Sequence, residues 1–548
     1  MTMNRLVLAA ATGAVLSMSI LTGVTAGPAG AASSHLPGQR NTTTGGGATS
    51  AATFKNPPSP ICSTETSTAA NVNIDCENLA PNDETPIAVN PTNPQNLLGS
   101  GNDTQYQYTG SGSKKIYGFI RAHYSLDGGQ TWTTVPIDLT GYNNSSDPAV
   151  SFDADGRAYI SVVAYTYAQG ASKTQPITPD VLVASSADGG KTWTKPVVVA
   201  KGQGVSTKNG LFNDKEYLTS WGHGNAVVTW TQFNFGQGGA FINAPIAASV
   251  SHDGGATWTV PQVISGSAPF CVGAASANAC DQNQFSYPVV TADGKIVVDF
   301  ESVRNASTGA SQELVVKLDP QTGARIAGPY KAIEYVDGIS DFPFNDFGET
   351  TLQDSAFRTT SSGNLVADPT NPAHLAIVGA DMRNTPHPVS ADAYSAVTNQ
   401  DLVITQSYDG GATWSAPTVV ALPGDQFMPW GAYDPTGHLR IGGFDRSDDA
   451  ANHSYFYSLW TETAPGSLSF SKTHLSTVAS NPTTGSRWYT DPANNPNFPN
   501  ANSFLGDYSG IAVTPTGRVV ALWTDMRGQV CVQGVCGSQE DAFFGSSS

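Results

Sequence analysis

Acidic side chains, one lysine and one tyrosine stand in short polar groups, each at the start of an apolar stretch. The groups are Asp83-Glu84, Asp147, Asp214-Lys215-Glu216 and Asp507-Tyr508. Carboxyl groups and a phenol in one place can provide a general acid, a general base and a nucleophile. The candidate catalytic residues are therefore Tyr508, Asp507, Glu84, Asp147, Asp214 and Glu216.

Four arginines form a second set, because each stands at the end of an apolar stretch. They are Arg304, Arg383, Arg446 and Arg527. A guanidinium offers a planar pair of donors that matches a carboxylate, so these four residues and Lys215 are candidate ligands for an anionic substrate. An Asp precedes several of them in Asp-x-Arg, and the alternative is that such pairs lock neighbouring elements together through salt bridges.

An octapeptide that recurs four times indicates which elements position these residues. It reads Ser-x-Asp-Gly-Gly-x-Thr-Trp and begins at Ser125, Ser186, Ser251 and Ser407. Stretches of alternating apolar residues precede the copies, which predicts a β-hairpin turn at each one. Asp and Ser can bond the turn amides, Gly takes positive φ, and Trp packs beneath the turn.

A second repeat predicts the number of units. Paired apolar stretches are joined by a Gly or Pro turn seven times. The turns lie within 86–94 and 365–372 and at Asp155-Gly156, Gly222-His-Gly224, Asp293-Gly294, Thr436-Gly437 and Thr516-Gly517. This spacing is typical of four-stranded propeller blades. We predict an all-β fold, a single β-propeller of seven four-stranded blades, with six as the alternative. The octapeptides would be the turns between third and fourth strands, and residues 70–74 would add the outer strand of the last blade.

The chain outside the propeller divides into three parts. Residues 1–31 read as a signal peptide, with Arg5 before an apolar run and a small-residue cleavage site, so we expect a secreted protein. A membrane anchor is the alternative, and no later stretch is long enough to span a bilayer. Residues 32–60 are a flexible leader rich in Ser, Thr, Gly and Pro, residues 61–80 a disulfide-stapled arm, and residues 81–548 the propeller.

Six cysteines fall into three local pairs. The pairs are Cys62/Cys76, Cys271/Cys280 and Cys531/Cys536. In an exported chain they predict three disulfides, each closing a short loop. A zinc site is the alternative, but no CxxC and no suitably spaced His accompanies them.

The charge balance excludes two classes of partner. The chain carries 26 Lys+Arg against 44 Asp+Glu, a formal net charge of −18. Such a surface repels nucleic acid and anionic membranes, so neither is an expected partner, and we expect a monomer. No cofactor or catalytic metal is predicted. Asp448-Asp449 and similar Asp-rich loops are candidates for structural Ca²⁺, although solvated turn carboxylates are the commoner outcome.

Loop lengths indicate which face carries the site. The predicted octapeptide turns and the first-to-second-strand turns are short and share one face. The long loops share the other face and cover 102–114, 201–213, 266–284, 334–363, 384–399 and 478–503. Binding and catalytic residues usually lie on long loops of a rigid scaffold, so we expect the site there.

The octapeptide resembles the Asp-box (BNR) repeat of sialidases and related β-propellers, in which the box is structural. Sialidases bind the sialic acid carboxylate with three Arg and use an Asp acid/base and a Tyr nucleophile activated by a Glu. Tyr508-Ser509 resembles the nucleophile position. The resemblance implies Tyr508 as nucleophile, Glu84 or Glu216 as its partner, Asp147 or Asp214 as acid/base, and Arg383, Arg446 and Arg527 as carboxylate ligands. Two features depart from the family: seven blades stand in place of six, and no Arg-Ile-Pro exists, Arg121 being the only comparable residue.

These expectations favour a secreted, sialidase-like glycoside hydrolase that acts on an extracellular glycan, with anionic glycans included. Two alternatives remain open. One is a polysaccharide lyase or another propeller glycosidase, with Tyr508 or Lys215 as base. The other is a non-catalytic propeller that binds glycan or protein, because a fold alone does not imply catalysis.

Overall fold

The computed structural model describes residues 70–75, 81–108, 114–118, 120–142, 144–167, 177–204, 209–345, 348–486, 503–532 and 535–547. The predicted signal peptide, the leader and the Cys62/Cys76 pair lie outside these residues. Within them, no helix is both long and apolar enough to cross a membrane.

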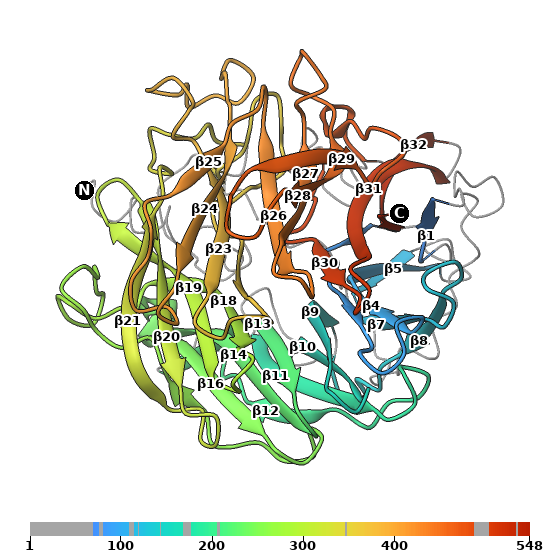
Figure 1. Cartoon of the computed structure of the whole chain (residues 1–548), viewed down its shortest axis with the longest axis vertical. Coiled ribbons are helices and arrows are strands. Elements are labelled where there is room, and N and C mark those ends of the chain that lie inside the picture. Colours follow the sequence, from blue (N-terminus) through green and yellow to red (C-terminus); the bar gives the residue numbers. More distant parts are fainter. Residues whose placement is uncertain are drawn as a thin grey trace.

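Seven antiparallel four-stranded sheets surround a central axis, which confirms the predicted seven-bladed propeller (Figure 1). The first strand of each blade contacts its counterpart in the next blade, so these strands form the inner ring. From the inner strand outward, the first three blades are β3 (Ile87–Val89), β4 (Leu97–Gly99), β7 (Arg121–Ser125) and β8 (Thr133–Pro136); β9 (Asn144–Phe152), β10 (Ala158–Tyr167), β11 (Ile177–Ser186) and β12 (Val197–Ala200); and β13 (Gly210–Trp221), β14 (Asn225–Phe235), β16 (Ile246–Ser251) and β17 (Gln262–Val263).

The remaining blades follow the same order. The fourth to sixth are β18 (Asn283–Val290), β19 (Ile296–Asn305), β20 (Ala310–Leu318) and β21 (Arg325–Glu334); β22 (Asn364–Ala367), β23 (Leu375–Asp381), β24 (Asp401–Ser407) and β25 (Thr418–Val420); and β26 (Gln426–Tyr433), β27 (Leu439–Asp445), β28 (Phe456–Glu462) and β29 (Phe470–His474). The seventh is β30 (Gly510–Val513), β31 (Val519–Val532), β32 (Val535–Ser546) and β1 (Asn71–Asn73).

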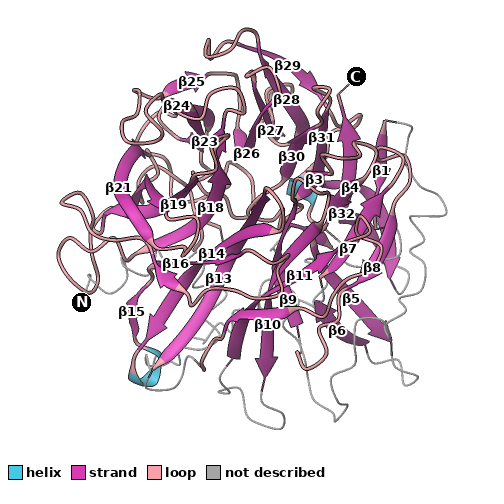
Figure 2. Ribbon diagram, turned by 60° about the horizontal axis from the view of Figure 1, so that its bottom comes forward, coloured by secondary structure: helices cyan, strands magenta, loops and turns pink. Residues whose placement is uncertain are grey.

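Within the described ranges, few elements stand outside the blades. They are the small sheet of β2 (Asn82–Asp83), β5 (Asn102–Tyr108) and β6 (Lys114–Gly118), the strand β15 (Phe241–Asn243) beside β14, and the 3₁₀ turns η2 (Gln237–Gly239) and η3 (Pro482–Thr484). Strands dominate the ribbon throughout the described chain (Figure 2).

The octapeptides form the turns between third and fourth strands of blades 1, 2, 3 and 5, as predicted. In the first copy, Ser125 Oγ accepts from the amide of Gly129 at 2.8 Å, and the Trp132 indole donates to the Gly129 carbonyl at 3.1 Å. Gly129 has a φ of 95°, a conformation that side chains disfavour. The same bonds recur in the other three copies, so the motif is a turn that fastens the blade edge.

Adjacent blades pack through the apolar faces of their strands. Between blades 2 and 3, for example, Tyr159 and Val181 belong to one buried cluster with Val228 and Trp230. Strands buried on both faces explain why many of these stretches are apolar at nearly every position.

The disulfide predictions are confirmed in one case. Cys271 and Cys280 are bonded, closing a loop before β18. Cys536 is also disulfide-bonded and lies opposite Cys531 in the β31–β32 register.

The N-terminal strand completes the last blade, as the sequence predicts. β1 pairs with β32, with Val72 opposite Phe544, so blue and red strands lie side by side in Figure 1. Asn71 extends this closure to blade 6: its amide donates to the Leu475 carbonyl at 2.8 Å, and its Oδ1 accepts from the backbone and hydroxyl of Thr477. The two ends of the chain thus hold the ring closed together.

Replacing Asn71 with Ala should weaken this closure, because Asn71→Ala leaves the buried carbonyl of Leu475 in blade 6 without this donor. We expect the free energy of unfolding to fall by about 1–3 kcal/mol. Urea denaturation checks this, with the exposed Gln130→Ala as control, expected within about 0.5 kcal/mol of wild type. Equal stability of Asn71→Ala and Gln130→Ala would contradict the closing role.

Candidate active site

Backbone kinks aim polar side chains at the axis. Glu84, Asp147 and Lys215 all have left-handed φ angles, of 52°, 56° and 52°. Asp147 and Lys215 lie at register shifts in the pairing of β9 and β13 with their neighbours, which marks them as β-bulges. Residues other than glycine rarely adopt this conformation, and bulges redirect side chains next to functional sites. Phe285 and Met428 repeat the feature in β18 and β26.

Three carboxylates meet at the ammonium of Lys215. Its Nζ lies 3.0 Å from Glu84 Oε1, 2.6 Å from Asp147 Oδ1 and 2.5 Å from Asp507 Oδ2. Blades 1, 2, 3 and 7 supply these residues. The Lys215 side chain is 7% exposed, so the group forms a buried ion cluster. We call Glu84, Asp147, Lys215 and Asp507 the central cluster.

A close approach of two blades brings Asp507 to Glu84. Gly506 has a φ of 88°, and a Cβ there would stand 2.5 Å from the Glu84 backbone nitrogen. Just beyond, the amide of Gly510 donates to the Thr85 carbonyl at 2.8 Å. A side chain at 506 would therefore separate the two carboxylates.

Arg358 contacts the central cluster and was not predicted from the sequence. It comes from the long segment between β21 and β22 and clamps Asp507 with two bonds, Nε to Oδ1 at 2.7 Å and Nη2 to Oδ2 at 2.6 Å. Its guanidinium also lies 3.5 Å from Glu349 and over the ring of Phe504. No repeat or motif marks this arginine, and its place in a predicted long loop was the only signal.

Asn102, at the start of β5, was missed as well. Its amide donates to Asp83 Oδ1 at 2.8 Å and to Glu84 Oε2 at 2.7 Å. Its own oxygen accepts from the backbone amide of Asp147 at 2.8 Å. Asn102 therefore orients Glu84 and ties it to the bulge that carries Asp147.

The pKa values of the carboxyl groups in and around the cluster are shifted in opposite directions. Burial, opposed by Lys215, raises the pKa of Glu84 well above its usual range. Burial also raises the pKa of Asp83 and of Asp214 to about 7, and that of Glu216 well above normal.

Asp507 shifts in the opposite direction. Burial acts to raise its pKa, but the charges of Arg358 and Lys215 outweigh it and hold the pKa far below normal. For Lys215 itself, burial is outweighed by neighbouring negative charges, Asp147 first and Asp507 second, so its pKa lies well above normal and the amine keeps its proton.

Tyr508 lies beside this cluster in an aromatic layer. Its ring is 6.0 Å from those of Tyr217 and Trp430, and Tyr287 completes the layer. The phenol donates to the Pro148 carbonyl at 2.7 Å, and burial followed by the charge of Glu84 raises its pKa well above normal. The carboxyl partner expected of a nucleophilic tyrosine does not accept this hydrogen bond.

The structure does not bring the four predicted arginines together. Arg383 and Arg527 each form two bonds to the Asp two residues earlier, Asp381 and Asp525. Arg304 pairs with the exposed Glu334 at 3.1 Å. The Asp-x-Arg pattern is thus satisfied locally, on one strand end, which is why equivalent positions do not converge on the axis.

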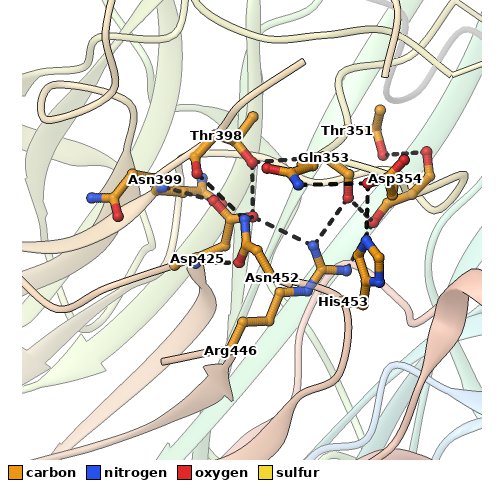
Figure 3. A network of polar contacts seen from close by, with 12 residues as sticks. Thr351, Gln353, Asp354, Thr398, Asn399, Asp425, Arg446, Asn452 and His453 are labelled. Carbon is orange, nitrogen blue, oxygen red and sulfur yellow. Dashed lines mark hydrogen bonds and ion pairs between the residues drawn. The ribbon is translucent and has the colours of Figure 1, made fainter. Parts of the chain in front are cut away.

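Arg446 is fully buried, with its guanidinium between Gln353 and Asp425 (Figure 3). Its Nη1 lies 3.4 Å from Asp425 Oδ2, and its Nη2 donates to Ser355 Oγ at 2.8 Å. The guanidinium also packs against the rings of Phe357 and Phe427. This arginine joins the segment before β22 to blade 6.

The Asp-rich loop considered for Ca²⁺ has internal partners. Asp445, Asp448 and His474 form the one group of three potential metal ligands found among the described residues. Lys472 Nζ lies 2.8 Å from Asp445 and 2.9 Å from Asp448, so an ammonium already occupies the position between these carboxylates. Asp449 accepts backbone amides of its own loop.

Arg446→Ala should lower the free energy of unfolding by about 3–5 kcal/mol, because it leaves Asp425 buried without its cation. Arg304→Ala is the matched control, since its ion pair is exposed, and should cost less than about 1 kcal/mol. Urea denaturation of both variants measures the difference. An equal loss of unfolding free energy in the two variants would contradict the structural role of Arg446.

Stability should fall as pH rises from 5 to 8. Burial, then the charge of Asp337, raises the pKa of Glu301 on β19 to about 8, against 4.5 for an ordinary Glu. The folded chain therefore keeps a proton that the unfolded chain has lost, which costs about 1.4 kcal/mol of stability per pH unit in this window. Glu301→Gln should flatten the slope by up to that amount in urea unfolding at pH 5, 6, 7 and 8.

Glu334→Gln is the control for this titration. The Glu334 pKa is lowered, chiefly by its bond from Lys331, so this side chain is ionised in both states above pH 5. Glu334→Gln should therefore leave the slope of unfolding free energy against pH unchanged. A slope unaltered by Glu301→Gln would contradict the protonated state of Glu301.

No protein-family model and no curated protein matches the sequence. Among solved structures, a Dyadobacter fermentans protein of unknown function aligns with a TM-score of 0.43 and 12% identity, covering 88% of this chain and 98% of its own. The Penicillium chrysogenum α-L-arabinanase complexed with arabinobiose aligns at 0.39 and 11%, covering 87% and 98%. The leech intramolecular trans-sialidase aligns at 0.41 and 13%, covering 89% and 71%. Enzymes named as glycosidases thus stand among the similar structures, but no role of a residue is drawn from likeness at this level.

Proposed function

We propose that the protein is an extracellular glycoside hydrolase whose active site is the central cluster. The supporting observation is that Glu84 and Asp507 contact the same ammonium, while their pKa values are shifted in opposite directions. Hydrolysis of a glycosidic bond uses one protonated carboxyl and one ionised carboxylate. The Cys271–Cys280 disulfide and the predicted signal peptide support an extracellular location.

In this proposal Glu84 is the general acid. Its raised pKa keeps the proton available at neutral pH, and Asn102 and Lys215 hold its two oxygens in place. Asp507 provides the ionised carboxylate, which stabilises the positive charge that develops on the sugar ring during bond cleavage. Arg358 keeps Asp507 ionised, and Asp147 completes the neutralisation of Lys215.

The geometry favours hydrolysis over the lyase alternative. A lysine acts as a base only when its amine is neutral, whereas the charges of Asp147 and Asp507 keep Lys215 protonated. The buried phenol of Tyr508 also retains its proton and donates it to a backbone carbonyl. A non-catalytic glycan-binding propeller remains the second candidate, and lack of turnover on every glycan tested would favour it.

Glu84→Gln should lower kcat/KM by a factor of about 10²–10⁴, because the amide keeps the shape and contacts but cannot give up a proton. Release of reducing sugar from a panel of oligosaccharides measures activity, and the melting temperature checks the fold. Glu334→Gln, an exposed carboxylate change, should be fully active. Turnover by Glu84→Gln within about threefold of wild type would contradict the acid role.

Tyr508→Phe separates this proposal from a tyrosine nucleophile. We expect kcat within about threefold of wild type, with stability lowered by about 1–3 kcal/mol through the unsatisfied Pro148 carbonyl. The same oligosaccharide assay and urea denaturation test both statements. Loss of turnover in a folded Tyr508→Phe would restore the phenol as nucleophile.

A further inference from the structure

The cations of the candidate active site are already neutralised. Lys215 contacts three carboxylates, and Arg358 contacts Asp507 and Glu349. Lys215 and Arg358 are the cations whose charges act most strongly on Asp83, Asp214 and Asp507, and Lys215 also acts on Glu84. A substrate carboxylate would therefore have to displace an existing ion pair to find a cation.

Further acidic groups would oppose an anion at this place. Asp214 and Glu216 flank Lys215 in β13 and are 2% and 1% exposed. Their pKa values are raised by burial and next by the charge of Asp147, so an additional negative charge would stand beside carboxyl groups that already resist ionisation. Binding of an anion is unfavourable for the same reason that these groups retain protons.

The same region offers hydrogen-bonding atoms that suit hydroxyl groups. Both oxygens of Glu216, Oδ2 of Asp214 and Oδ1 of Asn283 are buried and have no hydrogen-bond partner in the described chain. Buried polar atoms are nearly always bonded, so these atoms point to a polar ligand. A neutral carboxyl both donates and accepts, as a sugar hydroxyl does.

A small pocket continues this surface between blades 3 and 4. Phe233 and Phe241 provide apolar walls, and Gln282, Asn283, Gln284 and Glu301 provide amide and carboxyl groups. Phe285 follows Gln284 in β18, and its ring centroid is 6.0 Å from Lys215 Nζ, so β18 connects the pocket to the central cluster. Aromatic walls with neutral amides and no cation match an uncharged polyol.

We propose that the site selects an uncharged sugar, and that the pocket of Phe241, Asn283 and Glu301 contacts its hydroxyl groups. This inference rests on the proposed glycosidase function and narrows its substrate class. It departs from the anionic glycan that the resemblance to sialidases implies, because that substrate requires arginines which here are bonded to Asp381, Asp425 and Asp525.

Matched pairs of sugars test this selectivity. Galactobiose and digalacturonate differ by the carboxylates at C6, and lactose and 3′-sialyllactose differ by one anionic sugar; arabinobiose and xylobiose extend the neutral set. Binding to the intact protein is measured by calorimetry and saturation-transfer NMR at pH 6, with cleavage followed by chromatography. We expect a neutral sugar to bind at least about tenfold more tightly than any anionic one, a difference of about 1.4 kcal/mol.

The outcomes separate the two proposals. Tighter binding or preferential cleavage of digalacturonate or 3′-sialyllactose overturns the inference and leaves the glycosidase function standing. Neutral sugars that bind without cleavage support the inference and contradict the glycosidase function. No binding by any of the six sugars counts against both.

Pocket variants test the contacts themselves. Asn283→Leu keeps the size of the side chain but removes its polar atoms, and should weaken neutral-sugar binding about tenfold, as expected for a lost hydrogen bond. Gln130→Ala, an exposed change in the first octapeptide turn and outside the pocket, is the control and should bind within about threefold of wild type. Full binding by a folded Asn283→Leu, or an equal loss of binding in Gln130→Ala, would overturn the assignment of the pocket.

Discussion

The buried ion cluster at Lys215 is the interaction on which the candidate site depends. One ammonium, 7% exposed, contacts carboxylates from three other blades. Removing either the lysine or one of its acidic partners would leave a buried charge without its counterion. A single broken pair of this kind lowers the free energy of unfolding by about 3–5 kcal/mol. The bulges at Asp147 and Lys215, the close approach at Gly506 and the closure of the ring by β1 all hold these residues at one point on the axis.

Charge balance within the site follows from the small number of cations. Lys215 and Arg358 hold Asp507 ionised, while burial raises the pKa values of Glu84, Asp214 and Glu216. The region can thus hold a general acid and an ionised carboxylate close together, while the binding of an anionic substrate there is unfavourable. The same balance supports both the proposed hydrolysis and the proposed preference for a neutral sugar.

Much of the fold was predictable, because turn chemistry is local. The Ser-x-Asp-Gly-Gly-x-Thr-Trp turns, the seven first-to-second-strand turns and the closing strand near residues 71–73 all carry their signals within a few residues. Glu84, Asp147, Lys215 and Asp507 were predicted as a group for a related reason. Each enters the ring at an equivalent position, and propeller symmetry brings equivalent positions together.

Contacts made by non-repeating segments were not predictable. Arg358 and Asn102 lie outside the blade repeat, so no periodicity indicates that they reach Asp507 and Glu84. The prediction that the strand-end arginines converge was wrong for the opposite reason. The repeated pattern exists, but Arg383 and Arg527 each form an ion pair with the Asp two residues earlier on the same strand. Burial of Arg446 depends on loop packing that the sequence does not reveal.

The protonation states of Glu84 and Asp507 test the central claim most directly. Carboxyl carbons labelled with ¹³C can be titrated by NMR, with Glu84→Gln and Asp507→Asn assigning the two signals. The account predicts that Glu84 stays protonated at pH 7 while Asp507 stays ionised down to pH 3. Titration of both groups near their usual values, 4.5 for Glu and 3.8 for Asp, would contradict it.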